Sequence, residues 1–192
     1  ANALAAFILN EFRAYDTAYD QHLRGGPSLT NEAQRGMALF FGKANCAACH
    51  SGPLLSDQSF HAMGTPPLGP GKDKDDLGYT RDIGRAAVTG LPADAYRFRT
   101  PMLRNVTLTG PWGHSGAFSD LTAFLRHHLN PVAGLDMAQI NPVLPMAEFA
   151  AYDAAAHTHQ IELIRSAAAY GMKSRTPAAL DESELADLVA FL

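Results

Sequence analysis

Two cysteines and one histidine stand at a spacing that can carry chemistry. Cys46 and Cys49 are separated by two residues, and His50 follows directly. Each thiol at this spacing can form a thioether with one vinyl group of a haem, and the adjacent imidazole then lies against the iron. The C-x-x-C-H pattern is therefore typical of covalent c-type haem attachment, with His50 as the proximal ligand.

Three other interpretations of the two cysteines are weaker. A disulfide across two intervening residues would restrain little chain. A thioredoxin-like redox motif requires a βαβ context, which the surrounding sequence lacks. A zinc site needs two more thiol or imidazole ligands at short spacing, and no C-x-x-C or H-x-x-x-H partner stands out. We therefore expect one covalently bound c-type haem that uses both cysteines of the chain.

The second axial position of the haem iron has several candidate ligands. The candidates are Met63, Met102, Met137, His61, His114, His127 and His128. A helix is expected over residues 119–130, and its apolar face consists of Leu121, Phe124, Leu125 and position 128. His128 lies on this face, whereas His127 points about 100° away from it. We expect His128 to be the ligand, and we interpret His61 as a structural or pocket-lining residue.

The elements that position these residues are predicted to be mostly helical, with few strand patterns. Residues 51–95 are rich in Gly, Pro and Asp and predict a long irregular loop. Gly36, Phe40 and Phe41 precede the haem motif and should pack against the last helix, as in a cytochrome c core. The expected helices are 4–23, one that begins near Thr30 and Asn31, 119–130 with Ser119 as N-cap, about 147–170, and one that begins at Asp181 with Glu184 as capping-box partner.

Composition limits the class of protein. Of 192 residues, 47% are hydrophobic and 18% are charged, and the net charge is 15 − 19 = −4. This balance excludes a disordered tail and favours neither nucleic acid nor an anionic membrane as partner. No apolar run approaches the roughly 18 residues of a membrane span. We expect one mostly α domain with long irregular loops and helical extensions, in which residues 1–28 form a linking helix and residues 29–192 the haem domain.

Six segments of the chain follow one another in an order that is hard to obtain by chance. They are residues 29–50, Phe60-His61, Asp76-Leu77-Gly78, residues 98–106 (F-R-T-P-M-L-R-N-V), residues 109–116 (T-G-P-W-G-H-S-G) and residues 185–192. With these segments, the sequence resembles the C-terminal, electron-transfer half of the bacterial di-haem cytochrome c peroxidase family, which includes the MauG proteins. The resemblance covers nearly the whole chain.

The resemblance implies a function. Family members carry two c-type haems, of which the N-terminal one reacts with peroxide and the C-terminal one relays electrons. This chain has one C-x-x-C-H motif, so we expect the first haem domain to be absent from it and to be its partner. The expected protein is a periplasmic oxidoreductase that receives electrons from a donor protein or oxidises a protein substrate, and this chain alone is not competent. The alternative is a stand-alone mono-haem electron carrier.

The resemblance also implies ligands. The family's second axial ligand, a Met or a Tyr, lies in the helix after the P-aromatic-x-H-x-G segment, and counting from His114 places His128 there. A His–His pair should give a lower reduction potential than a His–Met pair. The family binds calcium partly through backbone carbonyls, which match those of Thr109 and Pro111 here.

Three further side chains are candidates for the haem surroundings. Arg99 and Arg104 could pair with haem propionates through charge-assisted hydrogen bonds, or form salt bridges at the surface or core edge. Trp112 stands where the resemblance implies an aromatic residue, and it could lie on an electron path or serve only in packing. The sequence leaves these alternatives open.

Overall fold

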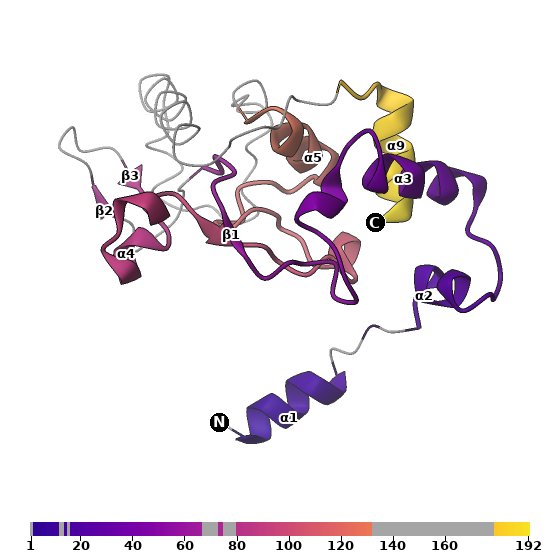
Figure 1. Ribbon diagram of the computed structural model, residues 1–192, viewed down its shortest axis with the longest axis horizontal. Helices are drawn as coiled ribbons and strands as arrows, with labels where there is room; N and C mark the ends of the chain where they lie inside the picture. Colours follow the sequence, from indigo (N-terminus) through magenta and orange to yellow (C-terminus); the bar gives the residue numbers. More distant parts are fainter. Residues whose placement is uncertain (1, 12–13, 15, 67–72, 75–79, 132–178) are drawn as a thin grey trace.

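The computed structural model describes residues 2–11, 14, 16–66, 73–74, 80–131 and 179–192 (Figure 1). Within these ranges helices dominate, which confirms the mostly α class, and each strand has two residues. The helices are α1 Asn2–Glu11, α2 Ala18–Leu23, α3 Asn31–Phe41, α4 Ala86–Thr89, α5 Leu121–Leu129 and α9 Glu182–Phe191, with 3₁₀ turns η1 Cys46–Ala48, η2 Pro92–Asp94 and η3 Val106–Leu108. The strands are β1 Phe60–His61, β2 Asp73–Lys74, β3 Thr80–Arg81 and β4 Phe98–Arg99. The helix expected at 147–170 lies outside the described residues.

The N-terminal segment is not the single helix that was expected over residues 4–23. It forms α1 and α2, and α1 projects away from the rest of the molecule (Figure 1). The Thr17 hydroxyl accepts from the backbone N–H of Asp20, and the Asp20 carboxylate accepts from the backbone N–H of Thr17. This capping box starts a new helix at Ala18, so the apolar stripe is divided between two helices.

The core forms where α3 and α9 cross, side by side in Figure 1. Gly36 of α3 lies so close to α9 that a Cβ atom there would be 1.9 Å from the backbone oxygen of Asp187. Phe40 and Leu188 are almost completely buried beside this crossing. Each such side chain contributes about 1.5–3 kcal/mol by its burial. The expectation that the helix before the haem motif packs against the last helix is confirmed.

Ion pairs hold α9 against the other helices. Arg35 donates to both carboxylate oxygens of Asp187, each at 2.7 Å. Lys43, just after α3, donates to Glu184 at 2.6 Å. Arg126 of α5 pairs with Glu182 of α9. α9 therefore joins the segment before the haem motif to the helix that carries His127 and His128.

The region expected to be an irregular loop, residues 51–95, contains short regular elements. β1 pairs with β4 in antiparallel orientation, with Phe60 opposite Arg99, and β2 pairs with β3. The Ser56 hydroxyl donates to the Thr100 carbonyl at 2.8 Å, so the loop is tied to the chain near β4. Two-residue strands leave no periodic pattern in a sequence, which explains why they were not predicted.

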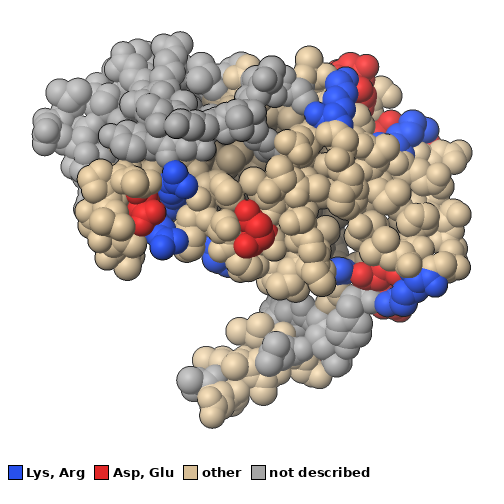
Figure 2. Space-filling model, in the orientation of Figure 1, with Lys and Arg blue, Asp and Glu red and all other residues tan. Residues whose placement is uncertain are grey.

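The visible surface carries small groups of opposite charges, with no large field of one sign on the face shown in Figure 2. Exposed ion pairs of the described residues include Arg24 with Asp16 and Arg85 with Asp94. Among the described residues, no helix is both long enough and apolar enough to cross a bilayer.

Candidate haem-binding site

The C-x-x-C-H motif folds into one tight turn. Asn45 enters it in the left-handed region, with a φ of 50°, and the 3₁₀ turn η1 follows. The backbone N–H groups of Cys49 and His50 both donate to the carbonyl of Cys46, at 3.2 and 2.9 Å. Both cysteines are half-buried, and His50 is 8% exposed. One turn of backbone thus holds the three residues that the motif assigns to a haem.

The His50 ring is held by a backbone carbonyl. Its Nδ1 lies 3.1 Å from the carbonyl oxygen of Leu55. A carbonyl can only accept, so Nδ1 carries the proton and Nε2 keeps its lone pair for a metal. Leu55 itself has a φ of 50°, an unfavourable conformation for a side-chain-bearing residue. The turn after the motif therefore selects the tautomer of His50 that an axial ligand requires.

The ring of His128, on α5, lies near the ring of His50. The two ring centroids are 6.4 Å apart, and the ring planes make an angle of 41°. A metal–imidazole bond is about 2 Å long, so two rings on opposite sides of one metal have centroids about 6 Å apart. The observed separation fits this arrangement. Together with the two thiols, the donor set fits a covalently attached c-type haem with two imidazole ligands.

His127 lies in different surroundings from those expected. It is completely buried, with its ring 5.0 Å from that of Phe118 and nearly parallel to that of Phe124. Among the described residues, neither ring nitrogen has a partner of normal hydrogen-bond geometry, although the Gly64 backbone lies near enough to favour protonation. Burial lowers the pKa of His127 to about 4. The expectation that His127 turns away from the core was wrong, because α5 is covered on two faces.

The methionine candidates have different surroundings. Met102 is 50% exposed, and Met63 is half-buried. Met137 lies outside the described residues. The ring facing His50 among the described contacts is that of His128, so we keep His128 as the candidate second ligand.

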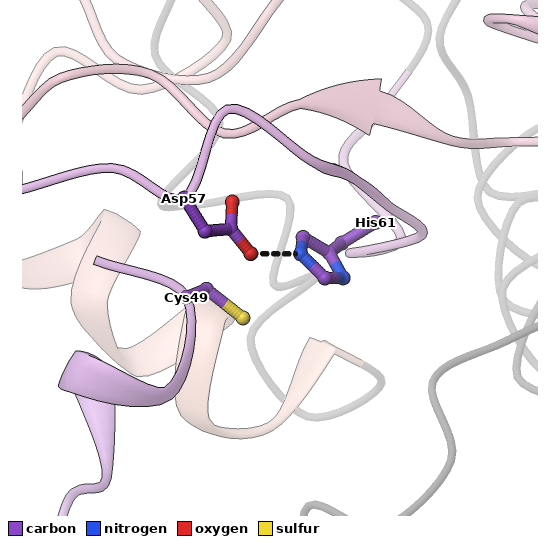
Figure 3. A group of neighbouring side chains, drawn as sticks. All are labelled: Cys49, Asp57 and His61. Carbon is purple, nitrogen blue, oxygen red and sulfur yellow. Dashed lines mark hydrogen bonds and ion pairs between the residues drawn. The ribbon is translucent and has the colours of Figure 1, made fainter. Parts of the chain in front are cut away.

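His61 lies beside Cys49 and Asp57 (Figure 3). Its Nε2 is 2.8 Å from Asp57, whose other oxygen accepts from the backbone N–H of Ser59 at 2.9 Å. Burial raises the pKa of Asp57, and the hydrogen bonds from His61 and Ser59 outweigh it and lower the pKa to about 2. Potential ligand atoms of the three side chains lie within 4.8 Å of one another, a grouping that sequence reasoning missed. The ion pair braces the loop beside Cys49, as expected for a structural His61.

His114 connects two loops. Its ring stacks on Phe98 at 3.8 Å, and its Nδ1 lies 2.6 Å from the Thr65 hydroxyl. Its Nε2 lies 3.4 Å from a carboxylate oxygen of Asp82. These contacts attach the turn before α5 to the loop after β1.

The two arginine candidates have protein partners. Arg104 donates to Asp20 at 2.6 Å and to two backbone carbonyls, which matches the salt-bridge alternative and argues against a propionate role. Arg99 is exposed and donates to the side chain of Gln58. The Trp112 indole N–H donates to the Val106 carbonyl at 2.9 Å.

The carbonyls considered for calcium belong to a turn on the surface. Thr109 and Pro111 are both exposed and precede Trp112. Trp112 pairs through its backbone with Phe118, which lies in the core. The turn is thus attached to the core behind it, while residues 109–111 remain accessible.

Comparisons with known proteins give a consistent result. A cytochrome-c peroxidase, IdrP1, of Denitromonas iodatirespirans is 42% identical over 114 residues, 49% of this chain and 30% of that protein. The methylamine utilization protein MauG of Methylorubrum extorquens is 42% identical over 98 residues, 51% of this chain and 25% of that protein. MauG of Paracoccus denitrificans is 32% identical over 154 residues, 74% of this chain and 40% of that protein. No family model matches the chain.

Solved structures agree with the sequence relatives. A MauG-like protein associated with microbial copper homeostasis has a TM-score of 0.61 at 26% identity, covering 93% of this chain and 47% of that one. A diheme peroxidase variant from Burkholderia thailandensis has a TM-score of 0.62 at 21% identity and supports the cytochrome c-like fold. The chain spans 25–40% of the three curated relatives described above and about half of these structures.

Proposed function

The chain is a relative, in sequence and in structure, of the bacterial di-haem cytochrome c peroxidases and MauG proteins, and we propose that it forms the electron-relaying haem domain of such an oxidoreductase. The observation that carries the proposal is the position of His128 opposite His50, next to the C-x-x-C-H turn. The relatives are named as cytochrome c peroxidases and MauG, which are oxidoreductases.

Four residues hold the cofactor in this proposal. Cys46 and Cys49 form the thioethers, and His50 and His128 provide the axial nitrogens. A haem bound in this way supplies a reversible one-electron centre. The Leu55 carbonyl keeps the His50 proton on Nδ1, and the Phe124 ring packs edge-to-face against that of His128, with the ring centroids 4.9 Å apart.

Two side-chain ligands restrict the chemistry of the domain. If His50 and His128 both hold the iron, the haem would exchange electrons and would leave no position open to peroxide. The peroxide-activating haem then belongs to an N-terminal haem domain, the partner that the family implies. The electrons come from a donor protein, or in the MauG-like case the oxidising equivalents reach a protein substrate.

The remaining parts of the proposal concern location and calcium. Because c-type haem is attached outside the cytoplasm, we place the protein in the periplasm. Thr109 and Pro111 are exposed, and their backbone carbonyls are oxygen donors suited to a hard cation such as calcium. In this proposal the calcium ion lies between the two haem domains.

The alternative function is a stand-alone mono-haem electron carrier. The names of the relatives, cytochrome-c peroxidase and MauG, favour the two-haem oxidoreductase. Sequencing the reading frame upstream of residue 1 separates the two functions. A second C-x-x-C-H motif upstream supports the peroxidase or MauG-like oxidase, and an upstream frame without one supports the carrier.

The ligand proposal is tested on protein produced with a bacterial c-type haem maturation system. A pyridine haemochrome assay should give one haem per chain, and the ferric protein should be low-spin without the near-infrared band of a His–Met pair. The variant His128→Met should acquire that band. The matched control His127→Met should keep the spectrum of the parent protein, because His127 is packed against Phe118. A methionine band in the parent protein refutes His128 as the ligand.

A further inference from the structure

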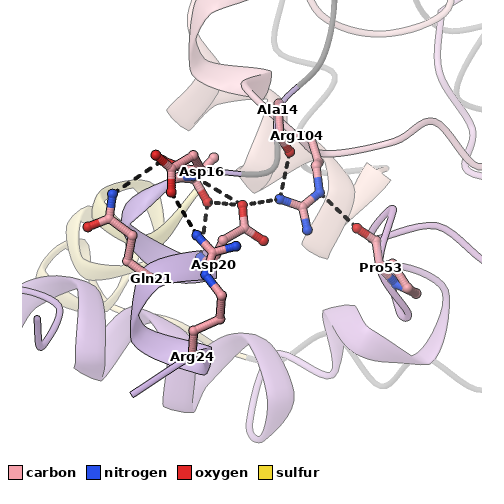
Figure 4. A network of polar contacts seen from close by, with 8 residues as sticks. Ala14, Asp16, Asp20, Gln21, Arg24, Pro53 and Arg104 are labelled. Carbon is pink, nitrogen blue, oxygen red and sulfur yellow. Dashed lines mark hydrogen bonds and ion pairs between the residues drawn. The ribbon is translucent and has the colours of Figure 1, made fainter. Parts of the chain in front are cut away.

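Arg104 connects three separate parts of the chain (Figure 4). Its Nη1 donates to a carboxylate oxygen of Asp20 at 2.6 Å and to the carbonyl of Ala14 at 2.8 Å. Its Nε donates to the carbonyl of Pro53 at 2.8 Å. The side chains of Arg104 and Asp20 are only 16% and 11% exposed, so their ion pair is shielded from solvent, whereas Pro53 lies in an exposed part of its turn.

Pro53 belongs to the turn that holds the proximal histidine. Within this turn the Leu55 N–H donates to Gly52 at 3.0 Å and the Ser56 N–H donates to Ser51 at 2.8 Å. Leu55 adopts the left-handed region, and its carbonyl accepts from His50 Nδ1 at 3.1 Å. Such strain at a functional site persists only when neighbouring contacts hold it in place. The Arg104–Pro53 hydrogen bond is one of these contacts.

We propose that Arg104 is a positioning residue for the proximal ligand, acting through the Pro53 carbonyl on the turn that presents the Leu55 carbonyl to His50. The Asp20 carboxylate of α2 holds the guanidinium of Arg104. The docking of α2 is therefore coupled, through Arg104 and the Pro53 carbonyl, to the electronic properties of the haem site. This inference rests on the proposed function, since it takes His50 as an axial ligand.

The coupling has an expected direction. A carbonyl that accepts from Nδ1–H increases the electron density on the imidazole and makes it a stronger donor to a metal. A stronger donor favours the ferric state and lowers the reduction potential. A turn that is no longer held by Arg104 presents a weaker acceptor, so the potential should rise.

The test uses the haem-loaded variant Arg104→Lys. Lysine keeps the charge and can still pair with Asp20, but its single nitrogen cannot reproduce a fork that reaches both Asp20 and Pro53. We expect the midpoint potential to shift upward, while the low-spin spectrum and the haem content stay those of the parent protein. The matched control Arg85→Lys changes an exposed arginine that pairs with Asp94, and its potential should not shift.

An Arg104→Lys potential equal to that of the parent protein overturns the inference. If this variant carries less haem, the double variant Asp20→Asn with Arg104→Gln is measured instead, since it removes both charges together. An upward shift there supports the inference, and an unchanged potential overturns it. The haem content of the parent protein is measured separately, so a chain that takes up no haem refutes the proposed function and is not confused with a failure of Arg104.

Discussion

His127 and His128 are neighbours in the sequence, yet α5 gives them opposite surroundings. His127 packs against Phe118 with no exposed surface, whereas the ring of His128 lies 6.4 Å from that of His50. A lowered pKa keeps His127 neutral, which suits a residue buried among aromatic rings. Two histidines of the same helix therefore have separate roles, one in packing and one as a candidate ligand.

Gly36 is the residue at which the α3–α9 crossing is most sensitive to substitution. We expect Gly36→Ala to destabilise the haem-loaded protein by about 1–3 kcal/mol or more, because the Asp187 carbonyl must move to admit a methyl group. Urea unfolding followed by circular dichroism measures this loss. Ala38→Ser, on the exposed side of the same helix, should stay within about 0.5 kcal/mol. If the urea midpoint of Gly36→Ala equals that of the parent protein, α3 and α9 do not approach each other as closely as the structure shows.

At the scale of elements, α2 is held by a charged contact that depends on pH. The hydrogen bond from Arg104 lowers the pKa of Asp20 from 3.8 to about 2, although burial acts in the opposite direction. A lowered folded-state pKa contributes stability above about pH 4 and loses it as the pH falls towards 2. The stability difference between the parent protein and Asp20→Asn should therefore shrink over this range.

Acid titrations of the unfolding free energy check this expectation. Asp16→Asn is the matched control, because Asp16 pairs with Arg24 in solvent, and surface pairs contribute about 0–1 kcal/mol. An acid dependence that is the same for Asp20→Asn and the parent protein contradicts the assignment.

Capping residues show which elements the sequence could predict. Thr30 begins α3 and Asp181 begins α9 with Glu184 in a capping box, as expected. The start of α5 was placed one residue early, because Asp120, not Ser119, accepts from the Ala123 N–H. Local signals of this kind lie within four residues of one another, so a sequence alone contains them.

The missed features depend on distant partners. The expected helix over residues 4–23 is divided because Thr17 and Asp20 form a capping box. The continuous apolar stripe from 4 to 23 obscured this Thr-x-x-Asp signal in the sequence. The β1–β4 pair joins Phe60 to Arg99, and the Arg104–Asp20 contact spans 84 positions. Neither leaves a periodic pattern. The C-x-x-C-H motif was readable because its chemistry is local, whereas the contacts of Arg104 arise only when the chain folds.

For the whole molecule, the proposed ligand pair of His50 and His128 predicts that the haem domain does not react with peroxide. The haem-loaded parent protein should show no spectral change with hydrogen peroxide or cyanide at concentrations that saturate an open haem. His128→Ala should become high-spin and bind cyanide, because it opens one axial position. Spectral titration measures both.

The matched control for this experiment is His127→Phe. Phenylalanine is close in shape to the buried imidazole and should leave the domain low-spin and unreactive. If the parent protein binds cyanide as readily as His128→Ala, its second axial position is open, and the domain is no simple relay.

The crossing of α3 with α9 also bears on the order in which the core closes and the cofactor is attached. Arg35 and Asp187, which meet there, are 152 positions apart. α3 cannot bury its Gly36 face until residues 182–191 have docked on it, and folds closed by such distant contacts form slowly. In the proposed function, we expect Cys46 and Cys49 to be accessible over that interval to the enzymes that join cysteine to haem. The same crossing that completes the core would thus leave time for the cofactor to be attached first.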